Sequence, residues 1–141
     1  MTRINSILNF LYERFGIEKD VFDGYALIED KDVWVTSRES ASFEMKFWRR
    51  KGIRLVRVFK KSYKFTTSGM QIFGKYATKN VVDLENENDL KRFLRGENVR
   101  INVGGVEEGQ VIVKYNGDVI GSAIYRHGVL KNQLPKGRRL I

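Results

Sequence analysis

The chain has 141 residues, of which 42% are hydrophobic, with a net charge of +9 and no cysteine. This length allows one domain or two small ones, and the hydrophobic content is sufficient for a folded core. The absence of cysteine excludes disulfides, thiolate metal sites and thiol nucleophiles. The sequence has neither an apolar run of about 18 residues nor the pattern of a signal peptide, so we expect a cytoplasmic protein.

The positive charge is concentrated in two segments of the chain. Residues 43–82 have a net charge of +10 and residues 99–141 of +4, whereas residues 1–42 and 83–98 have −3 and −2. A generally basic composition would raise the total charge without segregating it in this way. The distribution therefore favours a protein that binds a polyanion.

The first part of the chain predicts one helix followed by short strands. Apolar residues recur with helical spacing over residues 3–15, and Gly16 stands where a helix ends. Residues 25–29 and 33–37 predict two strands joined by a polar turn. Residues 39–50 fit neither a helix nor a strand clearly.

The stretch IRLVRVF, residues 53–59, predicts a strand in which the alternation of side chains is broken. A β-bulge near Leu55 and Val56 would restore the alternation and would leave Arg54 and Arg57 together on the opposite face. A strand buried on both faces, with arginines that extend to solvent, fits the same residues. Both interpretations stay open from the sequence.

A short helix is predicted over residues 66–76, with Met70, Ile72 and Phe73 turned inward. A short strand follows over residues 80–84.

The clearest helical signal covers residues 86–96. Asn86 is a good N-cap, acidic residues in the first turn interact favourably with the helix dipole, and Gly96 ends the helix.

The remainder of the chain predicts β-structure. Strands over residues 109–115 and 118–125 are joined by Asn-Gly, the strongest two-residue hairpin signal. A second turn at His127-Gly128 leads to a strand over residues 129–134. Short strands joined by glycine turns indicate a small barrel.

Signals for catalysis and metal binding are weak. His127 is the single histidine and falls in a predicted turn, and the carboxylates follow no metal-binding spacing. The glycine-containing segment 103–109 precedes a strand and lacks the lysine of a phosphate-binding loop. No base is available to activate a serine nucleophile. We therefore expect no enzyme activity, no metal and no cofactor.

Basic and aromatic residues lie next to one another within residues 47–51 and 60–64. Arginine and lysine neutralise phosphates, and aromatic rings stack on unpaired bases. Burial in a core explains any single ring better, but the clustered charges must face water or a polyanion. From this part of the chain, the residues expected to contact RNA are Arg49, Arg50, Arg54, Arg57, Lys60, Lys61 and Lys64.

Two segments resemble a known family. LKRFLRGENV, residues 90–99, resembles the helix and following turn of PUA domains, the small RNA-binding β-barrels of RNA-modification enzymes. The run from GQVIVKY onward is similar to the C-terminal PUA-like domain of the Nop/Sun/Fmu family of RNA cytosine-5 methyltransferases. It includes that family's Leu130-Lys131-Asn132 element, followed by Pro135 and Arg138.

The resemblance is specific over residues 86–140 and looser over residues 1–82. Near the N-terminus, ERFGI and VFDGY look like the segment that precedes the PUA domain in stand-alone archaeal members. The methyltransferase domain of the family has no counterpart in these residues, and its catalytic cysteines are missing. The resemblance therefore implies RNA binding, in ribosome biogenesis, rRNA processing or RNA modification, and does not imply methyl transfer.

In PUA domains the surface around the first helix and the last strand contacts RNA. The resemblance places the corresponding positions of this chain at Lys91, Arg92, Arg95, Gly96, Lys131, Lys136, Arg138 and Arg139.

We predict an α+β protein in which a mixed N-terminal subdomain, residues 1–82, packs on a C-terminal PUA-like β-barrel, residues 83–141. Its expected function is non-catalytic binding of structured ribosomal or transfer RNA, with a double-stranded stem recognised by shape. Further expected partners are an RNA methyltransferase or a ribosome-assembly factor. One alternative is a protein-interaction module that recruits or completes a separate RNA methyltransferase. Another is a metal-dependent hydrolase that uses Glu44 or Asp83.

Overall fold

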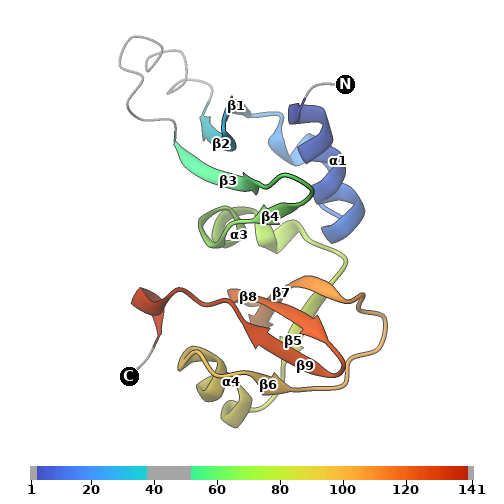
Figure 1. The fold of residues 1–141 in the computed structure, drawn as a ribbon, viewed down its shortest axis with the longest axis vertical. Helices are drawn as coiled ribbons and strands as arrows, with labels where there is room; N and C mark the ends of the chain where they lie inside the picture. The colour runs from blue at the N-terminus through green and yellow to red at the C-terminus, as the bar shows by residue number, and fades with distance from the viewer. Residues whose placement is uncertain (1–2, 38–51, 140–141) are drawn as a thin grey trace. The chain divides into compact units, whose positions relative to one another are not determined.

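Residues 3–37 and 52–139 are described by a computed structural model (Figure 1). The chain divides into two compact units, residues 1–76 and 77–141. The ambiguous segment 39–50 lies outside the described residues. None of the helices that the structure describes has the length and hydropathy needed to cross a bilayer.

The first unit combines helices with an antiparallel sheet. Its described elements are α1 (Arg3–Phe15), the 3-10 helix η1 (Lys19–Phe22), β1 (Tyr25–Asp30), β2 (Asp32–Ser37), β3 (Ile53–Val58), β4 (Tyr63–Phe65), α3 (Thr67–Phe73) and the 3-10 helix η2 (Gly74–Tyr76). The strands pair in chain order, β1-β2-β3-β4. The helix and the strands predicted in this part of the chain are confirmed.

Helix α1 buries one face and ends at a glycine. Ile7, Leu11 and Phe15 are spaced by four residues and are fully buried. Gly16 has a φ of 65°, and its N–H donates to the Tyr12 carbonyl at 2.8 Å. Glycine adopts this left-handed conformation without a steric penalty, so the chain turns there toward the sheet.

The predicted β-bulge in β3 is confirmed. Val33 of β2 pairs with Val56 and the next residue, Trp34, pairs with Arg54, so Leu55 is the extra residue of the bulge. Leu55 and Val56 are consecutive and yet both fully buried. An inserted residue allows this, because a regular strand turns successive side chains to opposite faces.

The predicted helix α3 is confirmed, but the sequence placed Ile72 on the wrong face. The Thr66 hydroxyl accepts a hydrogen bond from the Gly69 N–H at 2.9 Å. Met70 and Phe73 are buried, whereas Ile72 is 37% exposed. With 3.6 residues per turn, positions 69, 70 and 73 share a face, and Ile72 lies outside it.

The second unit is a curled sheet with one α-helix. Its described elements are β5 (Val81–Leu84), α4 (Glu87–Leu94), β6 (Val99–Arg100), β7 (Gly109–Tyr115), β8 (Asp118–Arg126), β9 (Val129–Asn132) and the 3-10 helix η3 (Lys136–Arg138). The strand order is β5-β7-β8-β9-β6, in which β5 is parallel to β7 and the other pairs are antiparallel.

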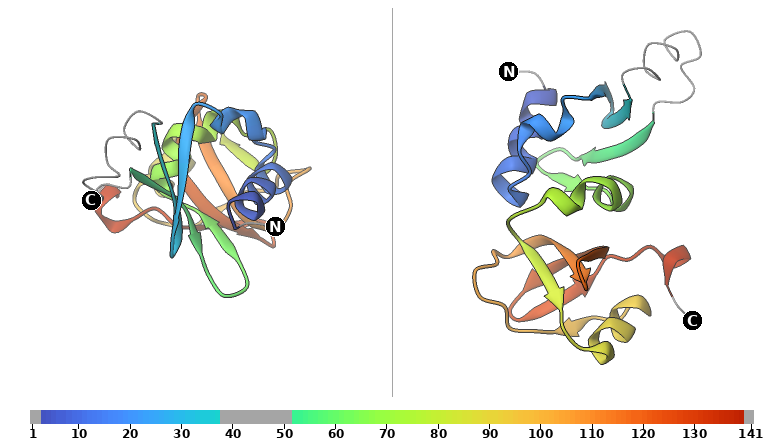
Figure 2. Two further views of the ribbon diagram at one scale, coloured as in Figure 1. Left: turned by 90° about the horizontal axis from the view of Figure 1, so that it is seen from above. Right: turned by 180° about the vertical axis from the view of Figure 1, so that it is seen from behind.

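The sheet of the second unit forms a half-barrel, as Figures 1 and 2 show. Strands β5 and β6 are its two edges, so the barrel expected from the sequence is open between them. Helix α4 contributes the fully buried Phe93 to a core that also contains Val99, Val111 and Leu130. The predicted α+β class is confirmed.

The local signals of the second unit are confirmed as well. The Asn86 side chain accepts a hydrogen bond from the Asp89 N–H at 2.8 Å and caps α4. At the first hairpin, Asn116 and Gly117 have φ values of 50° and 83°. His127-Gly128 forms the second turn in the same way, with φ values of 50° and 73°. Two consecutive positive φ values define the turn that best matches the twist of a hairpin.

Candidate nucleic-acid interface

Basic side chains gather on two surfaces, one in each unit. We call the first the basic hairpin, which comprises Arg57, Phe59, Lys60, Lys61 and Lys64 at the β3–β4 connection. We call the second the α4–tail surface, which comprises Lys91, Arg92, Arg95, Gly96, Lys131, Lys136, Arg138 and Arg139. Arg49 and Arg50, also expected to contact RNA, lie outside the described residues.

The basic hairpin has a two-residue tip. Arg57 pairs with Lys64 and Val58 with Tyr63 across the two strands. The Phe59 N–H then donates to the Ser62 carbonyl at 2.9 Å, which leaves the two lysines at the turn. Both lysines are exposed.

One face of this hairpin is covered and the other is basic. Tyr63 and Phe65 contact Phe10 and Phe15 of α1, each at 5.4 Å between ring centroids. Since side chains alternate along a strand, Arg57 and Lys64 lie together on the opposite face. Like charges directly opposite each other destabilise a strand pair, so this arrangement does not serve the stability of the sheet.

Arg54, the other arginine of β3, is held within its own unit. Its Nε lies 3.3 Å from the Asp32 carboxylate, and its guanidinium carbon lies 5.0 Å from the centre of the Trp34 ring. The guanidinium carbon of Arg57 lies 5.3 Å from the centre of the ring of Phe59, a neighbour on the hairpin. The register of β3 places the two arginines on the same face of the sheet. Their side chains nevertheless have different environments.

The α4–tail surface is organised around the end of α4. Gly96 has a φ of 87° and donates its N–H to the Phe93 carbonyl at 2.9 Å, while the Glu97 N–H donates to the Arg92 carbonyl at 3.0 Å. This pair of bonds is the Schellman motif, which closes a helix at a glycine. Lys91 and Arg95 are exposed, one turn apart on this end of the helix.

Asn132 connects strand β9 to the end of α4. Its side-chain nitrogen donates to the Phe93 carbonyl at 2.8 Å and to the Glu97 carbonyl at 3.0 Å. Its side-chain oxygen accepts from the Leu134 N–H at 2.7 Å. One asparagine therefore bonds to a carbonyl in the last turn of α4 and to another just beyond it, and it also orients the start of the tail. This explains the asparagine of the Leu-Lys-Asn element, to which the sequence assigned no role.

Arg139 lies against the backbone at Gly96. Its Nε donates to the Leu134 carbonyl at 2.9 Å. A Cβ atom built on Gly96 would come within 2.4 Å of the Arg139 side chain, so a larger residue at this position would displace that side chain. Leu134 is buried beside Phe93 and Gly121. The tail is thus fixed at both ends, and Lys136 and Arg138 are exposed between them.

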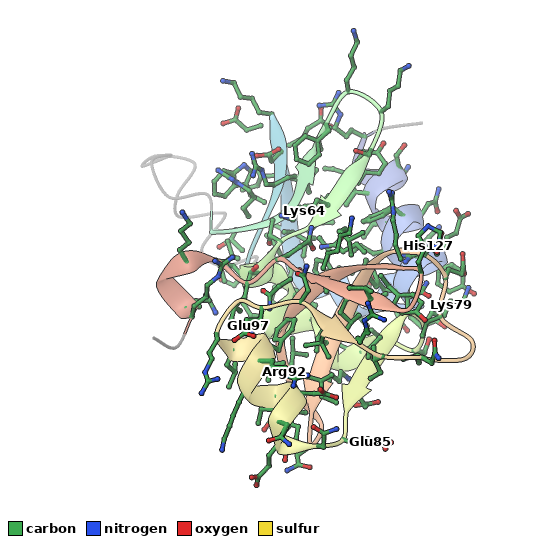
Figure 3. All side chains as sticks on the ribbon, turned by 60° about the horizontal axis from the view of Figure 1, so that its bottom comes forward. Lys64, Lys79, Glu85, Arg92, Glu97 and His127 are labelled. Carbon is green, nitrogen blue, oxygen red and sulfur yellow. The ribbon has the colours of Figure 1, made fainter. Side chains whose placement is uncertain are left out.

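The structure brings the α4 and tail residues together but keeps other charged groups apart from them. Figure 3 shows Arg92 and Glu97 beside α4, with Lys79 and His127 at a distance from both. His127 donates its backbone N–H to the Glu108 carboxylate at 3.0 Å, in keeping with a turn residue. Glu97 adds an acidic side chain at the edge of the α4–tail surface, which the sequence prediction did not take into account.

A hollow elsewhere in the second unit does not suit a phosphate. Its volume is about 520 Å³, and its lining includes Gly104, Gly105 and Lys79 together with two acidic residues, Asp83 and Glu107, which outnumber the lysine. Two carboxylates repel a phosphate anion. Within residues 3–37 and 52–139, no group of three or more His, Cys, Asp or Glu is placed to hold a metal ion.

Besides the roles of Asn132 and Glu97, the sequence reasoning missed three features of these surfaces. They are the exposed ring of Phe59, the pairing of Arg54 with Asp32, and the structural role of Arg139. The basic and aromatic residues within 60–64 indicated that the hairpin binds a ligand. The sequence analysis assigned this binding to the charged side chains and did not include Phe59. The other two features depend on contacts between residues distant in the chain, for which the sequence contains no local signal.

The chain is similar to known proteins over both units. The family model of the methyltransferase RsmF PUA domain matches residues 79–140. Ribosomal RNA small subunit methyltransferase F of Vibrio atlanticus is 34% identical over 116 residues, which cover 81% of this chain and 24% of the relative. The proteins of the same name from Shewanella sp. strain MR-4 and Shewanella baltica strain OS195 are 29% and 30% identical, and the matches cover 93% and 81% of the chain.

The chain spans about a quarter of the length of the curated relatives it matches. The 116 aligned residues of the Vibrio protein exceed the length of the second unit, so part of the first unit is also shared. The relatives named here are bacterial, and the archaeal resemblance of the N-terminal segment stays a prediction. With the α4 cap, the half-barrel and the tail in place, the unit that contains residues 79–140 belongs to the family of RsmF-type methyltransferase PUA domains.

Proposed function

We propose that these 141 residues bind structured ribosomal RNA and catalyse no reaction themselves. The observation that carries the proposal is the convergence of the α4–tail surface. Asn132 and the Gly96–Arg139 contact hold together the end of α4 and the segment from β9 to the tail, which are far apart in the chain. The cations between these contacts are exposed and available for phosphate groups.

The relatives give this surface a context. They are named for methylation of the small-subunit ribosomal RNA, and the chain corresponds to about a quarter of each. We therefore propose that the two units supply RNA binding in ribosomal RNA maturation. Methyl transfer would be carried out by other residues, because the family chemistry needs cysteines and the chain has none.

Binding to small-subunit ribosomal RNA, transfer RNA and duplex DNA at several salt concentrations tests the proposal. We expect tighter binding to ribosomal RNA, and an affinity that falls steeply with salt as counterions are released. A variant with Lys131, Lys136 and Arg138 replaced by Gln should bind about tenfold more weakly, with a shallower salt dependence.

The matched control removes three charges outside both basic surfaces, with Lys19, Lys31 and Lys75 replaced by Gln. Equal weakening in both variants would mean that only net charge matters, and the α4–tail surface would lose its role. No RNA binding by the unchanged protein at about 50 mM salt would reject the proposal itself.

The chain matches only about a quarter of the length of its relatives, and this favours one second candidate. It is a module that recruits or completes a separate RNA methyltransferase. In that case an apolar surface would carry the function. A complex with a methyltransferase that persists in high salt, together with no affinity for RNA, would support this candidate over the first.

A further inference from the structure

We propose that the basic hairpin holds an unpaired nucleotide of the bound RNA, with its base stacked on Phe59. This inference rests on the proposed function, because it names the part of the RNA that the first unit recognises. The inference concerns a different surface from the α4–tail surface. The experiment can therefore overturn the inference while the proposed function stands.

The ring of Phe59 is exposed where most of the hairpin's other apolar side chains are covered. It is 45% exposed, whereas Phe65 is fully buried and Tyr63 packs on Phe10. Phe59 follows β3 directly at the start of the hairpin turn, whereas the α1 rings contact Tyr63 and Phe65. The ring therefore presents an accessible apolar surface that contributes little to the core of the unit.

Positive charge surrounds this ring. The Arg57 guanidinium lies 5.3 Å from the ring centre, Lys64 is paired with Arg57 across the strands, and two lysines follow Phe59 directly. In the part of the chain that the structure describes, none of these four cations forms an ion pair with a carboxylate.

The carboxylate available beside β3 is already engaged. Asp32 pairs with Arg54 and accepts a hydrogen bond from the Val58 N–H at 2.8 Å. Asp32 therefore offers no free carboxylate to the hairpin cations, and a bound polyanion would supply counter-charge that the described residues do not.

An exposed ring among such cations fits a nucleotide. A base can stack on the open face of Phe59, and the guanidinium of Arg57 adds an electrostatic attraction to the aromatic system. The lysines at the tip are close enough in the chain to contact the flanking phosphates. A base inside a regular stem has both faces covered by its neighbours, so this site selects loops, bulges or ends.

A membrane surface is a weaker match for the same features. Peripheral membrane binding needs a sizeable apolar face that enters the lipid, and the hairpin exposes one large apolar ring. Binding to anionic lipid vesicles therefore serves as a comparison arm of the experiment.

The experiment compares a stem-loop RNA that carries 2-aminopurine in its loop with a fully paired duplex of equal length. Phe59→Ala should weaken binding to the stem-loop by about fivefold or more, and should leave duplex affinity unchanged. The 2-aminopurine fluorescence should be quenched by the unchanged protein and by Phe59→Trp, but not by Phe59→Ala. Tyr12→Ala, which removes a ring of similar exposure from α1, is the matched control and should behave like the unchanged protein.

The possible results separate the two proposals. If the unchanged protein binds neither RNA, the proposed function fails and the inference fails with it. If it binds both and Phe59→Ala has no effect, or weakens both equally, only the stacking inference is overturned. Binding of the hairpin to vesicles but not to the stem-loop would replace the nucleotide with a lipid surface and would also overturn it.

Discussion

The basic hairpin and the α4–tail surface both gather positive charge, but they differ in what the charged residues do for the fold. In the hairpin, Arg57 and Lys64 face each other, and the covered face of the sheet is complete without them. In the α4–tail surface, Arg139 is hydrogen-bonded to a carbonyl and fills the space beside Gly96. Clustered charge in a sequence therefore does not reveal which cations are available to a ligand.

The same contrast exists within one strand. Arg54 and Arg57 lie on the same face of β3, but Arg54 pairs with Asp32 and stacks on Trp34. Arg57 instead contacts the exposed ring of Phe59. The four predictions below test whether the hairpin affects binding alone while the α4–tail surface also affects stability.

The largest effect is expected from removing the charges of the hairpin. Replacing Arg57, Lys60, Lys61 and Lys64 with Gln should lower RNA affinity about a hundredfold at about 0.1 M salt, because each cation near a phosphate releases counterions. The free energy of unfolding should change by less than about 0.5 kcal/mol, or should rise as the repulsion is relieved. Filter binding and urea denaturation measure the two quantities. A large loss of stability would show that these cations are structural, and the contrast between the surfaces would disappear.

Asn132→Ala should lower the free energy of unfolding by about 2 kcal/mol or more, because it removes two hydrogen bonds to carbonyls at the end of α4 and the acceptor of the Leu134 N–H. Urea denaturation measures the change. The neighbouring exposed residue provides the control, since Lys131→Ala should stay within about 0.5 kcal/mol. Equal stability of the two variants would contradict the role assigned to Asn132.

Gly96→Ala should cost about 1–2 kcal/mol, because alanine is strained at a φ of 87°. The new Cβ would also meet the Arg139 side chain, so amide hydrogen exchange in residues 134–139 should become faster. In Gly104→Ala the Cβ would have no atom within 4 Å, and this variant should leave exchange in the tail unchanged. Unaltered exchange in Gly96→Ala would mean that the tail does not depend on the Gly96–Arg139 contact.

The smallest effect separates the two arginines of β3. Arg54→Gln should destabilise the protein by about 1 kcal/mol through loss of the ion pair and the cation–π contact, whereas Arg57→Gln should be close to neutral. A double-mutant cycle with Asp32→Asn measures the coupling to Arg54. For RNA affinity we expect the opposite order, with Arg57→Gln the more damaging change. Equal effects on stability would show that the position of Arg54 beside Trp34 contributes nothing.

The sequence by itself determined most of the local structure. The spacing of apolar residues predicted α1, the capping asparagine predicted α4, and the Asn-Gly and His-Gly pairs predicted both turns of the second unit. The broken alternation in residues 53–59 predicted the bulge. Each of these signals acts over a few residues, because it reflects backbone preferences and the repeat of a helix or strand. The error at Ile72 arose in a helix of seven residues, where periodicity is too short to define the buried face.

The tertiary structure decided which of the predicted binding residues are available to a ligand. Charge composition identified both basic regions, but the partners of Arg54, Asn132 and Arg139 come from other segments of the chain. Asn132 reaches carbonyls 35 and 39 residues away. Such contacts depend on how strands and helices pack, and no local pattern specifies them. The sequence therefore identified which types of side chain form each surface. The fold decides which of them stabilise the protein and which can bind a ligand.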